Sequence, residues 1–461
     1  MRSVLSVLLG LSLAACGVPQ ELQRHADLPA DIVFENTTIL DIESGALMAG
    51  QYVQVRDGRI IDISSRPVRG VSPDTRTIDA HDAIMMPGLI DMHVHVYDEA
   101  DLAASLAYGV TTVRNLGGFP FHLPMAERIE AGDLLGPRMI STGAIINDRD
   151  GRNVDPLQSL AGSEREVRSI VQEQYQAGFR HLKLYSNVSR ENFIAIQDEA
   201  ARLGMTISGH PVEGSEADPL PFSATLDAGF VTIEHTESIV WHALHDDTDP
   251  AGARALALQM AAAGARVTPT LIVHQNLARI VETQGQHLNR PEMASFSPIM
   301  QTLQSSTYDF WASYPHDDRT RMQAFYVEMT GLMHRAGVEL VVGTDAGVMV
   351  TPHGVSVSQE IELLVDAGLT PLEALQAATL IPARALEMED EIGRIAPGYA
   401  ADFMLLPRDP QTDLAVLRAP LGVMRNGIWL DADQLAALRD ASARPGELRT
   451  WRRLVEHVVT R

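Results

Sequence analysis

The stretch MPGLIDMHVHV, residues 86–96, is a short apolar run that ends in two histidines, His93 and His95. Its length and composition predict a buried β-strand. Residues two apart on a strand face the same side, so both imidazoles project together from the carboxyl end of this strand. Two neutral imidazoles on one rigid segment can chelate a divalent metal. A pair of ordinary core or surface histidines is the alternative.

Around this stretch, apolar strands alternate with helical segments, which is typical of a parallel α/β fold. Eight strands are predicted, at residues 84–94, 110–116, 138–146, 181–186, 206–210, 231–235, 266–273 and 340–345. Helices are predicted at residues 123–131, 164–177, 190–203, 216–228, 253–263, 322–336, 356–367 and 371–386. Eight such units favour a (β/α)8 TIM barrel, whose chemistry lies at the carboxyl ends of its strands. An open doubly wound sheet is the alternative, although no glycine-rich phosphate loop follows the early strands.

Two β-rich pieces flank this region. Residues 32–64 alternate short apolar runs with turn signals such as Asp57-Gly58, and residues 401–406 and 423–430 have the same character. The pattern predicts one small β-sandwich built from both chain ends. Its expected boundaries are residues 31–83 plus 395–431, with the barrel at 84–394 and a charged helical extension at 432–461. The sequence indicates no function for that extension.

The N-terminus has the pattern of an export signal. Arg2 precedes an apolar segment, residues 4–14, that is too short to span a bilayer. The residues Leu13-Ala14-Ala15-Cys16 then resemble a bacterial lipobox, which implies removal of residues 1–15 and lipidation of Cys16. We therefore expect a tether over residues 16–30 and a lipid-anchored protein facing the periplasm, at the outer rather than the inner membrane. A simple secretory signal with an incidental cysteine is the alternative.

Composition limits the partners of the chain. Its net charge of −24 argues against nucleic acid or an anionic membrane surface as a partner. Cys16 is the only cysteine, so the protein has no internal disulfide and depends on packing and metal for stability. The oligomeric state is open, and a homo-oligomer is compatible with the sequence.

Polar side chains stand at the carboxyl ends of several predicted strands besides the first. They are Lys183 in HLKLYS, His210 in TISGHP, His235 in TIEHTE and Asp345 in VVGTDAG. In a barrel, these strand ends meet at one mouth. None of the residues is specific alone, because a strand-end histidine is often structural and an aspartate near glycine often marks a turn. Together with the first two histidines, they predict one cluster of metal ligands.

These motifs resemble the amidohydrolase superfamily of metal-dependent hydrolases, and more narrowly its imidazolonepropionase-like and prolidase-like branch. The resemblance covers residues 31–431 and includes PGLIDMHVH, GVTTVRNLGG, IEHTE, GTDAG and the late TPLEALQAAT tail. Family members commonly have aspartate where this chain has Asn115. The residues Leu-Tyr-Ser-Asn after Lys183 also differ from the glycine-rich version of better-known dipeptidases.

The resemblance implies a binuclear centre with two divalent metal ions, zinc being the expected metal. It assigns one ion to His93, His95 and Asp345, and the other to His210 and His235. Lys183, carboxylated by carbon dioxide, would bridge the two ions together with a water or hydroxide. Burial and nearby cations both favour the neutral amine that carboxylation needs. An ordinary lysine ion pair is the alternative, and it would fit a mononuclear, deaminase-type enzyme.

The resemblance also implies a role for Asp345 in the reaction, and the strand and loop positions of other residues suggest further candidates. Asp345 would take a proton as the bridging hydroxide attacks and return it to the leaving amine. Tyr185 shares a strand face with the lysine and is a candidate to bind the oxygen of the tetrahedral intermediate, against an alternative of plain packing. Arg114, His274 and His353 are candidate substrate contacts. A structural ion pair is the alternative for the arginine, and loop structure for the two histidines.

The predicted function is therefore a lipid-anchored metallohydrolase that cleaves an amide-type C–N bond. Its expected substrate is a small peptide, as for a dipeptidase or prolidase, or an N-acyl amino acid. A cyclic-amide or carbamate hydrolase of the same branch and a mononuclear deaminase are alternatives. A catalytically silent envelope binding protein is the alternative from another class. Lys183 and Asp345 disfavour it, because a binding protein needs no proton shuttle.

Overall fold

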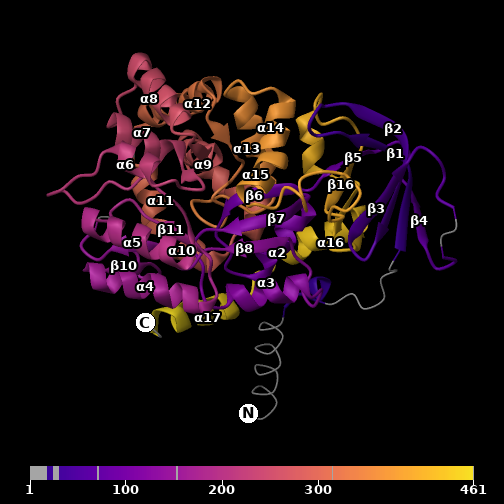
Figure 1. The fold of residues 1–461 in the computed structure, drawn as a ribbon, viewed down its shortest axis with the longest axis horizontal. Helices are drawn as coiled ribbons and strands as arrows, with labels where there is room; N and C mark the ends of the chain where they lie inside the picture. The colour runs from indigo at the N-terminus through magenta and orange to yellow at the C-terminus, as the bar shows by residue number, and fades with distance from the viewer. Residues whose placement is uncertain (1–17, 24–30, 70–71, 152–153, 314, 460–461) are drawn as a thin grey trace, which may run out of the picture.

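The computed structural model describes residues 18–23, 31–69, 72–151, 154–313 and 315–459 (Figure 1). The predicted signal peptide and Cys16 lie outside the described residues. Among the described residues, no helix combines the length and apolar character needed to cross a bilayer.

Both ends of the chain contribute to one mixed sheet of eight strands, seen at the right of Figure 1. Its hydrogen-bonded order is β18-β17-β16-β5-β1-β2-β3, with β4 pairing with β1. The N-terminal strands are β1 (Asp31–Leu40), β2 (Leu47–Arg56), β3 (Arg59–Ser64), β4 (Arg76–Asp79) and β5 (Ile84–Pro87). The C-terminal strands are β16 (Phe403–Leu406), β17 (Gly422–Arg425) and β18 (Ile428–Asp431).

This sheet curls around one core. The ring of Phe34 on β1 lies 5.2 Å from that of Phe403 and 5.0 Å from that of Trp429, centroid to centroid. Trp429 lies on β18, which three intervening strands separate from β1 in the sheet order, so the sheet must fold back on itself to bring the rings together. A composite domain from both chain ends requires such a joint core. Its division into the two packed layers of a β-sandwich stays a prediction.

Residues 84–94 join this sheet to the rest of the molecule. The single strand expected at residues 84–94 is wrong, because β5 ends at Pro87 and β6 (Leu89–Val94) belongs to a different sheet. Gly88 lies at the break, where an added Cβ would overlap the side chain of Thr111. A glycine is therefore required where the chain passes from one sheet to the other.

The remaining strands pair in parallel and form two sheets. The smaller sheet contains β6, β7 (Val110–Asn115) and β8 (Arg138–Ser141). The larger sheet follows the order β10 (Ser159–Ala161), β9 (Ile146–Asp148), β11 (His181–Leu184), β12 (Thr206–Gly209), β13 (Ile233–Glu234), β14 (Arg266–Thr268) and β15 (Glu339–Leu340). Hydrogen bonds link the two sheets at both ends, from Met92 N to Val342 O at 2.9 Å and from Gly143 N to His181 O at 3.2 Å. These contacts are those that a barrel would need, and the closed (β/α)8 barrel itself stays a prediction.

Helices surround the parallel strands (Figure 1). The helices up to the long insertion after β14 are α2 (Glu99–Ala107), α3 (His122–Glu130), α4 (Glu164–Ala177), α5 (Arg190–Leu203), α6 (Phe222–Asp227), α7 (Thr236–Leu244), α8 (Pro250–Ala262) and α9 (Leu271–Glu282). Those that follow are α10 (Pro298–Leu303), α11 (Ser305–Ala312), α12 (His316–Ala336), α13 (Val355–Asp366), α14 (Pro371–Ala377) and α15 (Leu380–Ala385).

Proline residues and turn geometry explain where the predicted bounds are wrong. The helix expected at 216–228 begins only at Phe222, because Pro219 and Pro221 keep the preceding backbone extended. The helix expected at 371–386 is two helices, α14 and α15. The strand expected at 266–273 ends at Thr268, and Thr270 adopts a φ of 50° that turns the chain into α9.

Both terminal pieces outside the three sheets dock on the body. Residues 18–23, within the expected tether, include a 3-10 turn at Gln20–Leu22. Leu22 is fully buried, and its carbonyl accepts a hydrogen bond of 2.9 Å from Leu135 N. The C-terminal extension forms α16 (Ala432–Ser442) and α17 (Glu447–Val459), as its helical pattern predicts.

Candidate metal centre

The backbone after β15 packs directly against the end of β6 and so brings Asp345 to the two histidines there. Asp345 N donates to His93 O at 2.7 Å, and Asp345 has a φ of 56°. Added Cβ atoms at Gly343 and Gly347 would crowd His93 and overlap the carbonyl oxygen of His95, respectively. The GTDAG motif therefore has glycines on both sides of the aspartate because the two backbones approach so closely.

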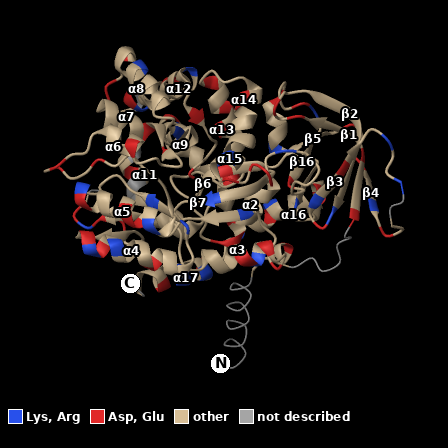
Figure 2. Cartoon of the chain, viewed as in Figure 1, with Lys and Arg blue, Asp and Glu red and all other residues tan. Residues whose placement is uncertain are grey.

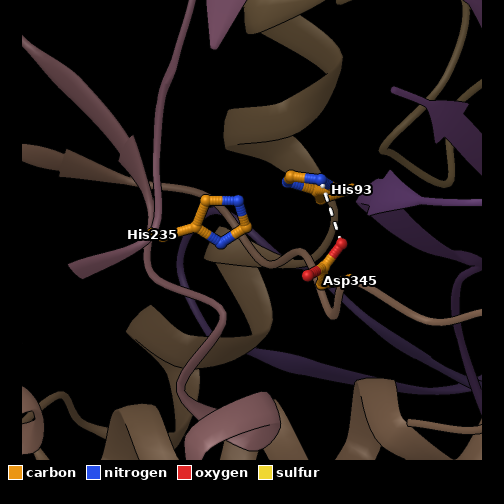
Figure 3. Close-up of side chains that lie close together, drawn as sticks. All are labelled: His93, His235 and Asp345. Carbon is orange, nitrogen blue, oxygen red and sulfur yellow. Dashed lines mark ion pairs between the residues drawn. The ribbon is translucent and has the colours of Figure 1, made fainter. Parts of the chain in front are cut away.

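The carboxylate of Asp345 faces the imidazoles of His93 and His95. Its Oδ1 lies 3.2 Å from His93 Nε2 and 3.0 Å from His95 Nε2. His93, His235 and Asp345 each offer one ligand atom within 4.8 Å of the others, and Figure 3 shows their side chains pointing toward one another. Asp345 Oδ1 has no hydrogen-bond partner among the described residues. Acceptor atoms that converge in this way are held together best by a cation.

Burial keeps the imidazoles of His93, His210 and His235 neutral. It lowers the pKa of His93 to about 4, with a nearby ammonium at Lys183 as the second cause. Burial likewise holds the pKa values of His210 and His235 well below the usual range. A neutral imidazole has a free lone pair, which is the form that binds a metal ion.

His210 and His235 lie next to this group. The ring of His235 is 4.7 Å from that of His93 and 4.5 Å from that of His210, centroid to centroid. His235 follows β13 with a φ of 68°, and its Nδ1 lies 2.7 Å from Thr270 Oγ1. Ser238 Oγ donates to Glu237, so it accepts from His210 Nδ1 at 3.2 Å and leaves His210 Nε2 for a ligand. The four predicted histidines and the aspartate are thus side by side.

Glu234 is a functional residue that sequence reasoning missed. It is fully buried and accepts a hydrogen bond of 2.8 Å from His93 Nδ1. That bond places the proton on Nδ1 and turns the lone pair of Nε2 toward Asp345. Despite the cost of burial, the Arg114 guanidinium holds the pKa of Glu234 well below its usual range. The signal for Glu234 was its position directly before His235 in a buried strand, where a carboxylate needs a partner.

Lys183 is buried near these residues. Its side chain is 1% exposed, and Nζ has no hydrogen-bond partner among the described residues. Burial lowers its pKa to about 8, which makes a neutral amine accessible near neutral pH. The ordinary ion pair that was the alternative is therefore not formed within the described chain. An amine in this environment fits the expected carboxylation and a bridging role.

The Tyr185 ring lies against the histidine cluster. Its ring lies 4.3 Å from that of His210, centroid to centroid. Burial raises the pKa of Tyr185, so the phenol keeps its proton and remains a hydrogen-bond donor. This position agrees with the expected contact to a substrate oxygen.

Arg114 lies in a structural ion pair, which was the alternative to a contact with substrate. Its guanidinium donates to Met92 O at 2.7 Å, to Ser208 Oγ at 3.1 Å, and to Thr232 and Glu234 at 2.7 and 2.9 Å. All three of its nitrogens are engaged and the residue is 3% exposed, so the geometry disfavours the expected contact with substrate.

Asn115 suits its environment in a way that aspartate would not. Its Oδ1 accepts from Val96 N at 2.8 Å, while its Nδ2 donates to Ser141 Oγ at 3.0 Å. The Ser141 hydroxyl already donates to Thr142 O. Since that hydroxyl can only accept from residue 115, an amide fits there and a carboxylate does not. The asparagine thus holds the backbone one residue beyond His95.

The two remaining candidates, His353 and His274, contact residues of the cluster or their neighbours. His353 Nε2 is 3.2 Å from His95 O, so it supports the backbone of that ligand. His274, in the first turn of α9, has its Nε2 3.9 Å from Glu237, the residue that binds Ser238 and thereby reaches His210. A direct contact of either histidine with substrate stays a prediction.

Comparisons with known proteins agree with this geometry. A family model described as the amidohydrolase family matches residues 84–430. The ochratoxinase of Aspergillus niger is 23% identical over 455 residues, covering 84% of this chain and 82% of that protein. The structure of a bottromycin amidohydrolase has a TM-score of 0.76 and 26% identity, covering 93% of this chain and 94% of its own. A prolidase structure complexed with N-methylphosphonate-L-proline has a TM-score of 0.66 and 23% identity, covering 87% of this chain and 100% of its own.

Proposed function

Since this chain belongs to the amidohydrolase family and is a metal-dependent hydrolase of C–N bonds, we propose that it cleaves the amide bond of a small peptide or an N-acyl amino acid. The observation that carries the proposal is the convergence of Asp345 Oδ1 on two buried imidazoles at 3.0 and 3.2 Å. This carboxylate can both hold a cation and move a proton. The likeness to a prolidase structure and to proteins named amidohydrolase and ochratoxinase agrees with an amide substrate.

We propose two zinc ions as the cofactor. His93, His95 and Asp345 would hold one and His210 and His235 the other, with carboxylated Lys183 between them. The unpartnered, buried amine of Lys183 supports the binuclear arrangement over a mononuclear, deaminase-type centre. When bound, the ions lower the pKa of water and polarise the substrate carbonyl.

The residues of the chain supply the remaining steps. Asp345 accepts the proton of the attacking water and delivers it to the amine nitrogen, which is a poor leaving group without that proton. The Tyr185 phenol donates a hydrogen bond to the oxygen of the tetrahedral intermediate. Glu234 acts through His93, whose ring it holds in one tautomer and orientation.

The proposal extends to architecture and location. The parallel sheets that meet through β6 support a (β/α)8 barrel, residues 84–394, and the curled joint sheet supports a composite β-sandwich. The lipobox-like sequence ending at Cys16 supports a lipid-anchored protein of the bacterial cell envelope.

A substrate screen on protein of counted metal content tests the function. Dipeptides, including X-Pro dipeptides, and N-acyl amino acids are expected to be hydrolysed by protein with two zinc ions per chain. Asp345→Asn should lower kcat by about a thousandfold or more, because it removes both a ligand and the proton carrier. Turnover of only cyclic amides or carbamates, one metal per chain with deamination, or metal binding with no turnover would each favour one of the alternatives.

A further inference from the structure

Helix α17 is attached to the body through one face only. Arg449 Nη2 and Nε donate to the Asp98 carboxylate at 2.7 and 2.9 Å, and Arg453 Nη2 donates to Glu99 at 2.8 Å. Both acidic residues and Leu454 are buried. Buried charge pairs that retain all their hydrogen bonds hold a helix in a fixed orientation. The opposite face of α17 is therefore presented to the surroundings in a defined direction.

The outer side of α17 carries an apolar stripe. Fifteen large hydrophobic side chains are exposed in the described part of the chain, and five of them lie on this one helix. They are Leu448, Trp451, Val455, Val458 and Val459, exposed by 53, 53, 39, 45 and 76%. Spacings of three and four residues place the first four on one side of a helix. Such a continuous apolar stripe marks a surface that has a partner.

The N-terminal segment of the mature chain is docked at the start of this helix. Arg444, three residues before Glu447, donates to Glu21 at 2.7 Å. Leu22, next to Glu21, is buried and bonded to Leu135. Cys16 precedes Glu21 by five residues, which span at most ~17 Å when fully extended. A lipid on Cys16 must therefore enter its bilayer close to the first turn of α17.

We propose that the outer face of α17, the stripe Leu448, Trp451, Val455 and Val458, lies on the bilayer surface that holds the lipid anchor. The inference rests on the proposed anchor at Cys16 and goes beyond it by fixing which side of the protein faces the membrane. An amphipathic helix binds a bilayer through its buried apolar side chains, and tryptophan favours the interface.

Charge selects a neutral rather than an anionic lipid surface. The chain carries a net charge of −24, and Asp and Glu are spread over many of its elements (Figure 2). On α17 the exposed Arg452 and Glu456 lie 3.4 Å apart and offset one another. The attraction must therefore come from the apolar side chains, because anionic lipid would repel the molecule as a whole.

Fluorescence quenching in reconstituted vesicles tests the proposal. The full-length protein, extracted from bacterial membranes, is placed in vesicles of phosphatidylcholine that carry bromine on the acyl chains. We expect part of the tryptophan emission to be quenched, and that part to be lost in Trp451→Phe. A mature chain with Cys16→Ser, which has no anchor, should bind phosphatidylcholine vesicles weakly. Leu448→Glu with Val455→Glu should reduce that binding by about tenfold or more.

The matched control is Leu258→Glu on α8. Leu258 is 63% exposed, and α8 lies at the opposite edge of the molecule from α17 (Figure 1). This variant should leave quenching and vesicle binding unchanged. Unchanged circular dichroism and thermal unfolding of the α17 variants would show that the charges act at the surface only.

The experiments distinguish a failure of the anchor proposal from a failure of the docking proposal. The mass of the extracted protein reports whether Cys16 carries acyl chains. An acylated protein whose Trp451 stays unquenched overturns the docking proposal and leaves the anchor in place. A dimer in solution that Val455→Glu dissociates, with no vesicle binding, also overturns it, because a second copy would then cover the stripe. Absence of acyl chains with quenching intact supports the face and removes the anchor.

Discussion

At the scale of single residues, the centre depends on groups that orient the ligands as much as on the ligands themselves. Glu234 fixes the proton on His93 Nδ1, and Asn115 holds the backbone after His95 through Val96 N. Neither residue binds the expected metals. The hydrogen bonds of Glu234 and Asn115 help to orient the imidazoles of His93 and His95 toward Asp345.

Substitution of Glu234 by glutamine should weaken metal binding. The amide is a poorer acceptor for His93 Nδ1–H, so we expect zinc affinity to fall by about 10–100-fold in a competition titration. It also leaves Arg114 buried without its charge partner, and the free energy of unfolding should fall by about 3–5 kcal/mol.

The matched control is Glu166→Gln, which breaks the exposed 3.0 Å pair with Arg149. Its effect on the free energy of unfolding should be much smaller than that of Glu234→Gln, with zinc affinity unchanged, because solvent screens an exposed pair. Equal losses in the two variants would contradict the orienting role of Glu234.

Asn115→Asp should destabilise the fold although it restores the residue common in the family. The new carboxylate would face Ser141 Oγ, whose proton is already donated to Thr142 O. We expect a loss of about 1–3 kcal/mol in urea unfolding. A variant as stable as the parent would show that Ser141 rotates freely to serve the carboxylate.

At the scale of elements, hydrophobic periodicity predicted the bounds of some helices and strands correctly and those of others wrongly. Helices α4 and α5 match their predicted bounds, because each is amphipathic over its whole length and ends at a glycine, Gly178 and Gly204. The apolar run 84–94 reads as one strand, yet it feeds two sheets. Periodicity cannot show this, since the break at Gly88 depends on Thr111 from a neighbouring strand.

The attachment of α17 to α2 should contribute strongly to stability. Arg449→Met leaves Asp98 buried with fewer donors, and we expect the free energy of unfolding to fall by about 3–5 kcal/mol. Arg452→Met, in the same helix but 71% exposed at its side chain, should change it by no more than about 0.5 kcal/mol. Chemical denaturation of both variants measures the difference, and similar values would show that α17 is held by its apolar contacts alone.

At the scale of the whole molecule, buried titratable groups make stability depend on pH. His122, outside the ligand set, accepts from Phe119 N and donates to Val96 O, and burial lowers its pKa to about 3. Carboxyls have raised pKa values, chiefly through burial, of about 7 for Asp91, Asp101 and Glu237 and about 8 for Glu360.

The metal-free protein should therefore be most stable near pH 6.5. A histidine with a depressed folded pKa contributes stability that is present above about pH 6.5, its unfolded pKa, and is lost as pH falls, by about 1.4 kcal/mol per unit for each group. These carboxyls act in the opposite sense, because their contribution to stability is lost as pH rises toward 7–8. Below pH 6.5 the buried histidines outnumber these carboxyls, so the loss of stability with falling pH is the larger effect. Urea unfolding with a chelator from pH 4 to 8 measures the curve, and a flat profile between pH 5 and 7 would contradict it.

The sequence by itself determined the local features of this protein. Strand alternation placed His93 and His95 on one face, and the strand-end positions predicted the other candidate ligands, because both follow from the short-range geometry of the backbone. Only the tertiary structure decided which distant groups meet. Glu234 reaches His93 across 141 residues, and α17 reaches Asp98 across about 350. Such contacts depend on how the sheets and helices pack together, and the period of a sequence carries no information about that packing.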